Sequence, residues 1–490
     1  MVDAVMRRAQ DAFFEYKKIT ATNRSLFLEN IAGAIEHIRE DAVAIAHKET
    51  NLPLARLNGE LTRTTSQLKL FANLLREGSW VEASIDTKDA ASPAKPDLRK
   101  MLAPMGPVIV FGASNFPFAF STAGGDTASA LAAGCSVVVK GHSAHAQTSQ
   151  LIFGAMKKAS DVSGMPAYTV QHVMGSGSTV GRELVEHPYA KGVGFTGSFA
   201  GGRALVEYSQ RREQPIPVFA EMSSINPVVF YPDTLSKNAA ALAGVYAGSI
   251  TLGVGQFCTN PGILFGIRGE GFEKFLDLLG EELSKVQPQK MLHSGICASY
   301  QKGVGNMLSQ QGLKVLSRSA GVVVGEAEVG LDAAAVLAVV SGEEFLRNPQ
   351  LTEEVFGPYS LAVVCADRAE LLQALQGLKG QLTSTIMATE SDRAEYGDVI
   401  EAQHNLAGRI ILNMPPTGVE VNASMVHGGP YPATTDARFT SVGTTAIKRW
   451  VRPVCLQNFT DGMLPDALKN SNPLGIMRLV NNLYTREAIQ

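Results

Sequence analysis

The sequence is poor in the cysteine patterns that mark metal-binding and disulfide-bonded proteins. Its five cysteines, Cys135, Cys258, Cys297, Cys365 and Cys455, stand far apart, with no Cys-x-x-Cys pair and no Cys/His ligand spacing. The spacing therefore indicates no zinc motif, and we expect no metal. An odd, sparse set of cysteines is typical of a reducing compartment.

Long apolar runs and an excess of one charge are also missing. No segment approaches the roughly 18 continuous apolar residues of a membrane helix. Acidic residues, among them Asp3, Asp11 and Glu15, interrupt the N-terminal segment, which is atypical of a transit peptide. The formal net charge of -3 provides no basic field for nucleic acid or anionic lipid. We expect a cytoplasmic protein that binds neither.

What the chain does contain is enough length and apolar content for several domains. It has 490 residues, of which 45% are hydrophobic and 18% charged; at roughly 100–200 residues per domain this suggests two to four domains. Short apolar runs alternate with helical segments in its first half, which predicts a doubly wound parallel sheet. The expected strands are Val108–Phe111, Ser136–Lys140, Tyr168–Met174, Gly192–Phe195 and Val218–Glu221, and the expected helices are Phe120–Ala133, Thr148–Ser160, Ser178–Glu186 and Phe199–Gln210.

The flanking segments have a different character. Val2 to about His47 is expected to form two amphipathic helices, and Ala55–Leu75 another. The polar stretch Asp86–Pro96 is typical of an extended arm, and the apolar tail Thr445–Phe459 suits a strand. These changes predict a first α/β domain from residues 1–80 and 101–223, a second from residues 224–436, and two strand-forming segments, residues 81–100 and 445–462.

Two successive strand-to-helix turns are rich in glycine and hydroxyl residues. The first, Gly175–Gly181, includes Gly177 and is either a phosphate-binding turn or an ordinary tight turn, because it departs from the strict Gly-x-Gly-x-x-Gly pattern. The second, Phe195–Ser198, places Gly197 and Ser198 at a helix start. Two such turns in sequence favour a dinucleotide site.

Three residues in turns and strand ends carry chemistry, although each has a plainer interpretation. Cys258 lies in a turn flanked by glycines, which is consistent with the polar, partly open setting that favours a reactive thiolate. The alternative is a buried, inert thiol. Glu221 ends a strand, where it faces a ligand crevice or is simply solvated. Asn115 follows the first strand and is either an oxyanion donor or a turn residue.

Together and in order, these motifs resemble the aldehyde dehydrogenase superfamily over nearly the whole chain. The matching segments are Asn115–Pro117, Lys140, Phe195–Ser198, Glu221, Gly255–Cys258 and Glu353–Pro358. The resemblance implies an α/β fold with a Rossmann-type cofactor domain, a catalytic domain and a small β oligomerisation arm. It also implies a homodimer or homotetramer formed through the two strand-forming segments.

The resemblance assigns roles residue by residue. Cys258 resembles the nucleophile that attacks the aldehyde carbon, and Glu221 the base that activates the hydrolytic water. Asn115 and the Cys258 backbone N–H resemble the oxyanion donors. Toward the NAD(P) cofactor, Lys140 resembles the ligand of the adenosine ribose and Ser198 that of the pyrophosphate. Glu354 resembles the ligand of the nicotinamide ribose, with Phe356 as its apolar neighbour.

Three departures from the common pattern of the superfamily point to one subgroup of it. Ser223-Ser224 replaces a double glycine, His427 stands in the Val426–Pro430 loop, and Ser143 replaces an acid. They resemble the α-ketoglutaric semialdehyde (2,5-dioxopentanoate) dehydrogenases and a related NADP-linked fatty aldehyde dehydrogenase. Because an acid would repel a 2′-phosphate, Ser143 beside Lys140 predicts use of NADP+ alongside NAD+. His427 either assists proton movement near the thiol or is a packed or solvent-facing residue.

The expected substrate residues lie on a helix and among nearby aromatic residues. Arg63 and Gln67 are four apart and share a face, so Arg63 either grips a substrate carboxylate or forms a surface salt bridge with Glu60. The apolar walls are predicted to be Phe116, Phe120 and Phe257, which also suit an aliphatic aldehyde. An intact Glu221 argues against transfer to coenzyme A, and the complete set of site residues argues against a non-catalytic structural relative.

Overall fold

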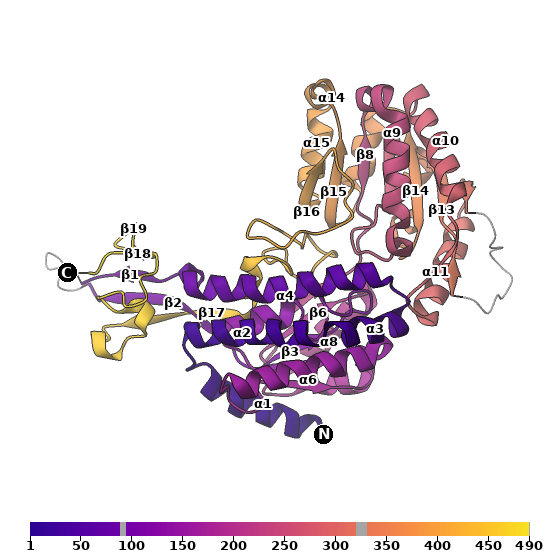
Figure 1. Ribbon diagram of the computed structural model, residues 1–490. Coiled ribbons are helices and arrows are strands. Elements are labelled where there is room, and N and C mark those ends of the chain that lie inside the picture. Colours follow the sequence, from indigo (N-terminus) through magenta and orange to yellow (C-terminus); the bar gives the residue numbers. More distant parts are fainter. Residues whose placement is uncertain (89–94, 320–330, 490) are drawn as a thin grey trace.

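The computed structural model describes residues 1–88, 95–319 and 331–489. Three large sheets organise these residues, two within the body of the molecule and one projecting away from it (Figure 1). Residues 89–94 of the predicted arm lie outside the described residues.

The first sheet confirms the doubly wound parallel arrangement. Its strand order is β5-β4-β3-β6-β7, and all neighbouring strands are parallel. The strands are β3 (Val108–Phe111), β4 (Val137–Lys140), β5 (Val170–Val173), β6 (Gly192–Thr196) and β7 (Val218–Glu221). The helices between them are α5 (Gly125–Ala133), α6 (Ala146–Val162), α7 (Arg182–Glu186) and α8 (Phe199–Gln210).

Local backbone geometry corrects three of the expected helix bounds. The helix expected from Phe120 starts at Gly125, because the chain turns tightly before it: a Cβ at Gly124 would lie 2.4 Å from the Ala119 carbonyl oxygen. The helix expected from Ser178 starts as a π-turn over Gly177–Gly181. The N-terminal segment forms three helices, not two, α1 (Val2–Tyr16), α2 (Ala21–His37) and α3 (Arg39–Thr50).

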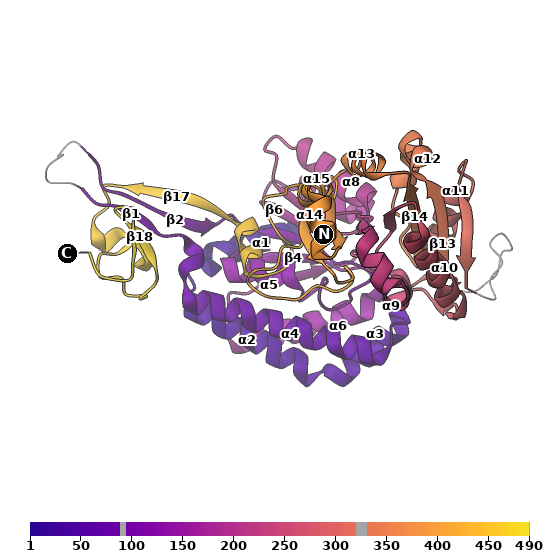
Figure 2. The same cartoon turned by 90° about the horizontal axis from the view of Figure 1, so that it is seen from above.

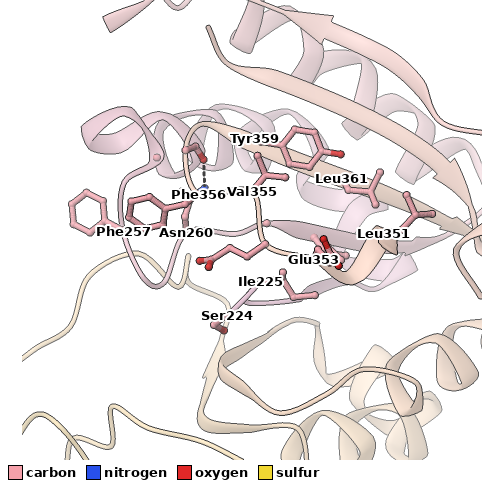
Figure 3. Close-up of a pocket in the computed structure, with 15 residues that line it drawn as sticks. Ser224, Ile225, Phe257, Asn260, Leu351, Glu353, Val355, Phe356, Tyr359 and Leu361 are labelled. Carbon is pink, nitrogen blue, oxygen red and sulfur yellow. Dashed lines mark hydrogen bonds between the residues drawn. The ribbon is translucent and has the colours of Figure 1, made fainter. Parts of the chain in front are cut away.

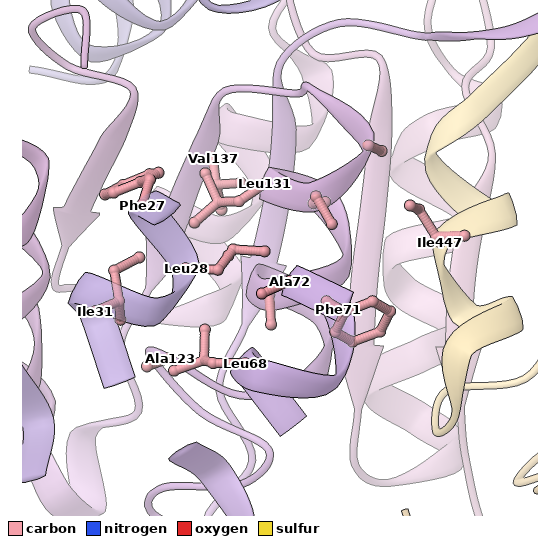
Figure 4. Packing of buried hydrophobic residues seen from close by; sticks show 14 of the residues in the cluster. Phe27, Leu28, Ile31, Leu68, Phe71, Ala72, Ala123, Leu131, Val137 and Ile447 are labelled. Atoms are coloured by element: carbon pink, nitrogen blue, oxygen red, sulfur yellow. The ribbon is translucent and has the colours of Figure 1, made fainter. Parts of the chain in front are cut away.

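The main hydrophobic core lies under helices α2, α5 and α4 (Leu54–Glu77). Phe27, Leu28 and Ile31 of α2 meet Leu68 and Phe71 of α4 against the sheet (Figure 4). All five are fully buried, so this layer fixes α4 firmly in place. That matters because one face of α4 points away from the core, toward the second half of the molecule.

The second sheet is larger and has its own set of helices. Its order is β11-β13-β14-β9-β8-β15-β16, with only the β11–β13 pair antiparallel. The strands are β8 (Val228–Phe230), β9 (Ile263–Ile267), β11 (Lys314–Arg318), β13 (Val336–Ser341), β14 (Tyr359–Cys365), β15 (Gln381–Met387) and β16 (Ala407–Leu412). A separate pair is formed by β10 (Gln289–Lys290) and β12 (Asp332–Ala333). The helices are α9 (Pro232–Thr251), α10 (Glu270–Lys285), α11 (Ser294–Leu308), α12 (Gly342–Arg347), α13 (Arg368–Gln376), α14 (Glu390–Glu395) and α15 (Gly397–His404).

Helix α9 is the one described helix that is long and apolar enough to cross a membrane, over Pro232–Gly255. Tyr246 and Ile250 of this helix are buried in a core shared with Phe275 of α10 and Phe230 of β8. Its apolar character is therefore that of a core helix in a layered α/β structure.

The third sheet forms the projecting arm (Figure 2). Its order is β17-β2-β1-β18-β19, with β1 (Ser84–Asp86), β2 (Leu98–Pro104), β17 (Val451–Gln457), β18 (Arg478–Val480) and β19 (Leu483–Thr485). The strand expected from Thr445 is wrong in its first part, because Thr444–Trp450 forms a 3₁₀ helix. Ala446, Ile447 and Trp450 are all buried, and this spacing is helical, so the segment packs into the core before β17 begins.

After the second sheet the chain returns to the edge of the first. The Met222 N–H donates to the Ala433 carbonyl at 2.8 Å, and the Thr435 N–H donates to the Ala220 carbonyl at 3.1 Å. An isolated antiparallel bridge joins Glu221 to Thr434 between them. The end of β7 is therefore covered by a segment more than two hundred residues further along the chain.

Candidate active site

The carboxyl edge of the first sheet gathers most of the predicted site residues. Lys140 ends β4, Glu221 ends β7, Asn115 follows β3, and Ser198 begins α8 directly after β6. Ligands of open parallel sheets bind at this edge. The second sheet faces it and supplies Cys258.

Cys258 follows a turn with unusual backbone geometry. Gly253, Val254 and Gly255 all adopt the left-handed conformation, with φ of 55°, 59° and 63°. A β-branched valine there is strained, by about 1–3 kcal/mol, and such strain persists where the surroundings impose it. A Cβ at Gly255 would lie 2.3 Å from the carbonyl of Gly357, so close packing against the Glu353–Pro358 segment requires glycine.

Four side chains form what we term the catalytic cluster: Glu221, Cys258, His427 and Ser441. His427 Nε2 lies 3.4 Å from Cys258 Sγ and 2.9 Å from Glu221 Oε1. Ser441 Oγ donates to the other carboxylate oxygen of Glu221 at 2.6 Å. The exposed fractions of the His427 and Glu221 side chains are 1% and 2%. A solvated Glu221 and a solvent-facing His427 are therefore both excluded.

The electrostatics of the cluster correct one expectation about the thiol. Burial, followed by the Glu221 charge, raises the pKa of Cys258 well above its ordinary value, and Arg63 only partly opposes this. Burial alone would also raise the pKa of Glu221, but His427, Ser441 and Cys258 together hold that pKa below its usual value. The resting pair is a thiol beside a carboxylate, not the thiolate that a polar, open turn predicted, so the nucleophile needs a proton acceptor.

Two N–H groups beside the thiol could serve as oxyanion donors. Asn115 is 9% exposed, and its Nδ2 donates to the Gln256 carbonyl at 3.1 Å, two residues before the thiol. Within the described residues the Cys258 backbone N–H has no acceptor, while Asn226 Nδ2 holds the Cys258 carbonyl at 2.9 Å. A second amide hydrogen of Asn115 and the Cys258 N–H thus remain to bind a developing charge.

The cofactor edge contains an amine without a protein partner. Lys140 is 8% exposed, and burial lowers its pKa. Across the described parts of the chain, its Nζ has neither a hydrogen bond nor an ion pair, which fits a ligand of ribose hydroxyls or phosphate. Ser143, three residues after Lys140, is exposed.

Ser198 Oγ caps α8 by accepting from the Gly201 N–H at 3.2 Å, and a Cβ at Gly177 would meet only open space. Gly197 lies between β6 and this cap.

A small pocket joins the nucleophile turn to the Glu353–Pro358 segment (Figure 3). Glu354 and Phe356 line it together with Gly255 and Phe257. Burial raises the pKa of Glu354 to about 7, although the Ser223 hydroxyl and the Ser224 backbone N–H both stabilise its charge. The pair Ser223-Ser224 thus holds the carboxylate predicted to bind the nicotinamide ribose.

The face of α4 that turns toward Cys258 carries Arg56, Glu60, Arg63 and Gln67, at helical spacing; we term it the arginine face. Glu60 is 5% exposed and accepts from the backbone N–H groups of Phe118 and Ala119 at 2.8 and 3.0 Å. In the described structure no ion pair joins Glu60 to Arg63, and Glu60 is not on the surface, so the alternative of a surface salt bridge is wrong.

Arg63 presents two buried nitrogens without a partner. Its Nε and Nη2 have no hydrogen bond within the described chain, and its guanidinium lies 5.3 Å from the centre of the Phe120 ring. Burial lowers its pKa, opposed by the charges of Glu60, Cys258 and Glu221. Gln67 is 3% exposed and lies against Gly125 at the start of α5. Arg63 thus lies near the Cys258 thiol, whereas Gln67 packs against α5.

The predicted apolar walls form one aromatic cluster. The Phe116 ring centre lies 5.3 Å from that of Phe120 and 5.6 Å from that of Phe257, both edge-to-face. Phe120 in turn lies 6.1 Å from the His427 ring. The three phenylalanines therefore connect the arginine face to the catalytic cluster.

Sequence reasoning missed Arg56. Its Nη2 donates to the Asn115 carbonyl at 2.8 Å, and its guanidinium lies 5.1 Å from the Phe116 ring and 4.7 Å from the Phe257 ring. Gly253 leaves room for it, because a Cβ there would lie 2.7 Å from Arg56 Nη1. Arg56 therefore ties the oxyanion loop to the nucleophile turn.

Ser441 was missed as well. It carries no motif, and only the returning chain brings it to Glu221. Arg56, by contrast, shows a sequence signal, since it lies seven residues before Arg63 on the same helical face.

Comparison with known proteins agrees with this geometry. A profile described as the aldehyde dehydrogenase family matches residues 1–434. The chain belongs to the aldehyde dehydrogenase family. The predicted family, fold class and aldehyde-oxidising activity are therefore confirmed.

Among its relatives, alpha-ketoglutaric semialdehyde dehydrogenase of Acinetobacter baylyi is 47% identical over 490 residues, covering 99% of this chain and 91% of the relative. Alpha-ketoglutaric semialdehyde dehydrogenase 2 of Azospirillum brasilense is 46% identical, covering 98% and 90%. Among solved structures, NAD+-bound betaine aldehyde dehydrogenase of Staphylococcus aureus has a TM-score of 0.78 at 17% identity, covering 93% of this chain and 88% of that one, which shows the shared fold.

Proposed function

We propose that this enzyme oxidises 2,5-dioxopentanoate, the semialdehyde of 2-oxoglutarate, to 2-oxoglutarate. Two relatives that share almost half of its residues bear the corresponding name. The observation that carries the proposal is Arg63, whose Nε and Nη2 are buried without partners beside the Phe120 ring. An unpaired buried guanidinium is costly, and a substrate carboxylate would offset that cost by bidentate pairing.

The first step is activation of the thiol. His427 Nε2, 3.4 Å from Cys258 Sγ, accepts the thiol proton. The same nitrogen lies 2.9 Å from Glu221 Oε1, so the new N–H donates to that carboxylate, which stabilises the imidazolium. The thiolate adds to the aldehyde carbon, and the oxygen acquires a negative charge that Asn115 Nδ2 and the Cys258 N–H stabilise. Donors of this kind are worth about 3 kcal/mol each.

After the addition, oxidation of the adduct and hydrolysis of the resulting thioester take place one after the other. A nicotinamide held beside Glu354 and Phe356 would supply the hydride acceptor for this oxidation, and the product on the protein would be a thioester of Cys258. Glu221 then accepts a proton from the water that attacks this thioester, which releases the acid and restores the thiol. Ser441 Oγ, bonded to Glu221 at 2.6 Å, keeps the carboxylate oriented for this proton transfer.

For the cofactor, we propose NADP+ with NAD+ as an alternative. Lys140 Nζ, which has no partner in the described residues, and the exposed hydroxyl of Ser143 would hold the ribose and its 2′-phosphate. Glu354 and Phe356 would hold the nicotinamide end at the pocket of Figure 3. Ser143→Glu is expected to raise the NADP+ KM at least tenfold and to leave the NAD+ KM within about threefold, because a carboxylate repels the 2′-phosphate.

The substrate assignment is tested by steady-state kinetics with Arg63→Met. We expect kcat/KM for 2,5-dioxopentanoate to fall by roughly 100-fold, since a buried charge pair loses one partner. Activity with pentanal, which has no carboxylate, should change less than about threefold. Arg76→Met is the matched control, because Arg76 lies on the same helix in an exposed pair with Glu29.

Two outcomes contradict the assignment. An equal loss of kcat/KM with both aldehydes would mean that Arg63 does not bind the substrate carboxylate. A wild-type preference for long aliphatic aldehydes would favour the fatty aldehyde alternative, to which the Phe116, Phe120 and Phe257 cluster is also suited.

We also propose that the chain forms a homodimer or homotetramer through the arm. Strand β17 pairs with β2 alone and so presents a free edge within the described sheet. Unprotected edges are ready templates for pairing with another chain. Light scattering after gel filtration tests this: Val454→Pro, on β17, should lower the molar mass, and an unchanged mass would contradict the role of this edge.

A further inference from the structure

The catalytic cluster brings together the three ligand types that zinc prefers. One sulfur of Cys258, one nitrogen of His427 and one oxygen of Glu221 all lie within 4.8 Å of one another. They come from a turn, a loop and a strand end that are far apart in the sequence. The absence of a local zinc motif therefore says nothing about this site.

Two of the three ligand separations are close to those around a tetrahedral ion. Zinc binds sulfur at about 2.3 Å and nitrogen or oxygen at about 2.0–2.2 Å, so tetrahedral geometry separates sulfur from nitrogen by about 3.5 Å and nitrogen from oxygen by about 3.3 Å. The observed separations are 3.4 Å for Cys258 Sγ to His427 Nε2 and 2.9 Å for His427 Nε2 to Glu221 Oε1. These two separations would change by roughly half an ångström or less when an ion binds. The third pair, Cys258 Sγ and the Glu221 oxygen, lies within 4.8 Å and would have to close to about 3.5 Å.

Charge and surroundings also favour a dication. A thiolate and a carboxylate neutralise Zn²⁺, and a neutral set can remain buried beside side chains that are only 1% and 2% exposed. Ser441 Oγ holds the second oxygen of Glu221, which is the outer hydrogen bond that fixes metal-ligating carboxylates. Arg63 and Arg409 act on the Cys258 charge and would oppose a cation, so the site is expected to be weaker than a structural zinc site.

We propose that Glu221, Cys258 and His427 form a three-ligand site through which Zn²⁺ reversibly inhibits this enzyme. Binding replaces the thiol proton: the Cys258 S–H bond breaks, a sulfur–zinc bond forms, and one proton is released to solvent. Because Cys258 is partly exposed, water can reach the ion and fill its fourth position. The bound thiolate is no longer free to attack, so the ion competes with the aldehyde. Inhibition rests on the proposed role of Cys258, whereas binding does not.

Cobalt is the probe for binding, because its thiolate complexes absorb in the near ultraviolet while zinc complexes do not. We titrate the full-length enzyme with Co²⁺ in the absence of substrate and expect one absorbing site per chain, which Zn²⁺ then displaces. The matched pair of variants is Cys258→Ser, which should lose the band, and Cys455→Ser, which removes an exposed thiol and should keep it. His427→Asn should weaken Co²⁺ binding at least tenfold.

Three results would overturn the proposal: no band at all, a band that survives in Cys258→Ser or after alkylation of Cys258, or unchanged affinity in His427→Asn. In activity assays the apparent inhibition constant for Zn²⁺ should rise in proportion to aldehyde concentration, and a chelator should restore activity; inhibition independent of aldehyde would also contradict it. If 2,5-dioxopentanoate is not the substrate, the titration is unaffected, because no substrate is present.

Discussion

The catalytic cluster and the arginine face lie next to each other but are built in opposite ways. In the cluster, His427 Nε2 lies 3.4 Å from Cys258 Sγ and 2.9 Å from Glu221 Oε1, and Ser441 Oγ donates to the second Glu221 oxygen. His427 Nδ1, on the far side of the ring, has no partner in the described chain. On the arginine face, Arg63 keeps two nitrogens, and Arg56 one, buried without a partner in the described chain. Groups that pair among themselves are arranged to move protons within the protein, whereas unpaired buried groups are arranged to receive something from outside.

The strongest test of this comparison removes the nucleophile. We expect Cys258→Ala to lower kcat by at least roughly 10⁴-fold, because covalent capture is lost entirely. The melting temperature, measured by calorimetry, should change by no more than a few degrees. Residual turnover above this level would mean that water attacks the aldehyde directly, and the cluster would then be a general base alone.

The next test separates the two proton acceptors of the cluster. Glu221→Gln and His427→Asn should each lower kcat by about 10²–10⁴-fold. Glu221→Gln should retain a rapid burst of NADPH because hydrolysis is slowed, whereas His427→Asn should lose it and slow the alkylation of Cys258 by iodoacetamide. Identical effects on burst and alkylation would contradict this division of roles.

Arg56→Met tests whether the second arginine of this face, which already donates to a protein carbonyl, has a positioning role instead of a substrate role. Since Arg56 holds the Asn115 carbonyl at 2.8 Å, we expect kcat to fall roughly tenfold through displacement of the oxyanion donor, with KM unchanged. Arg56→Lys should restore part of kcat. A rise in KM confined to acidic aldehydes would move Arg56 to the substrate site beside Arg63.

The smallest expected effect concerns Glu354, whose pKa is raised to about 7. A carboxylate accepts hydrogen bonds from ribose hydroxyls better than a carboxylic acid, so the cofactor KM should fall severalfold as the pH rises from 6 to 8. Because the raised pKa means that the folded state binds the extra proton, this group's contribution to stability is present at low pH and is lost as the pH rises toward 7. Glu354→Gln should abolish both dependences, measured by kinetics and by thermal unfolding.

Sequence reasoning succeeded where a residue's role follows from local pattern. Strands β3 and β7 and helix α8 have the bounds that periodicity predicts, and the carboxyl ends of parallel strands placed Asn115, Lys140 and Glu221 at one edge. It failed for the 3₁₀ helix Thr444–Trp450. This apolar segment, held in place by one buried tryptophan, shows no clear periodicity that would distinguish a helix from a strand. It also failed for the thiol, because the pKa of Cys258 depends on a carboxylate that only the fold brings to it.

The return of the chain to β7 has a consequence for how activity arises during folding. Ser441 and Glu221 are 220 residues apart in sequence, and Cys258 and His427 are 169 apart. Contacts of such long range form late, after both sheets are assembled, because loop closure must come first. A chain emerging from the ribosome therefore exposes Glu221 and Cys258 well before His427 and Ser441 have been synthesised. Cys258 gains its proton acceptor, His427, only when the second sheet is complete. Activity of the enzyme therefore indicates that folding is complete.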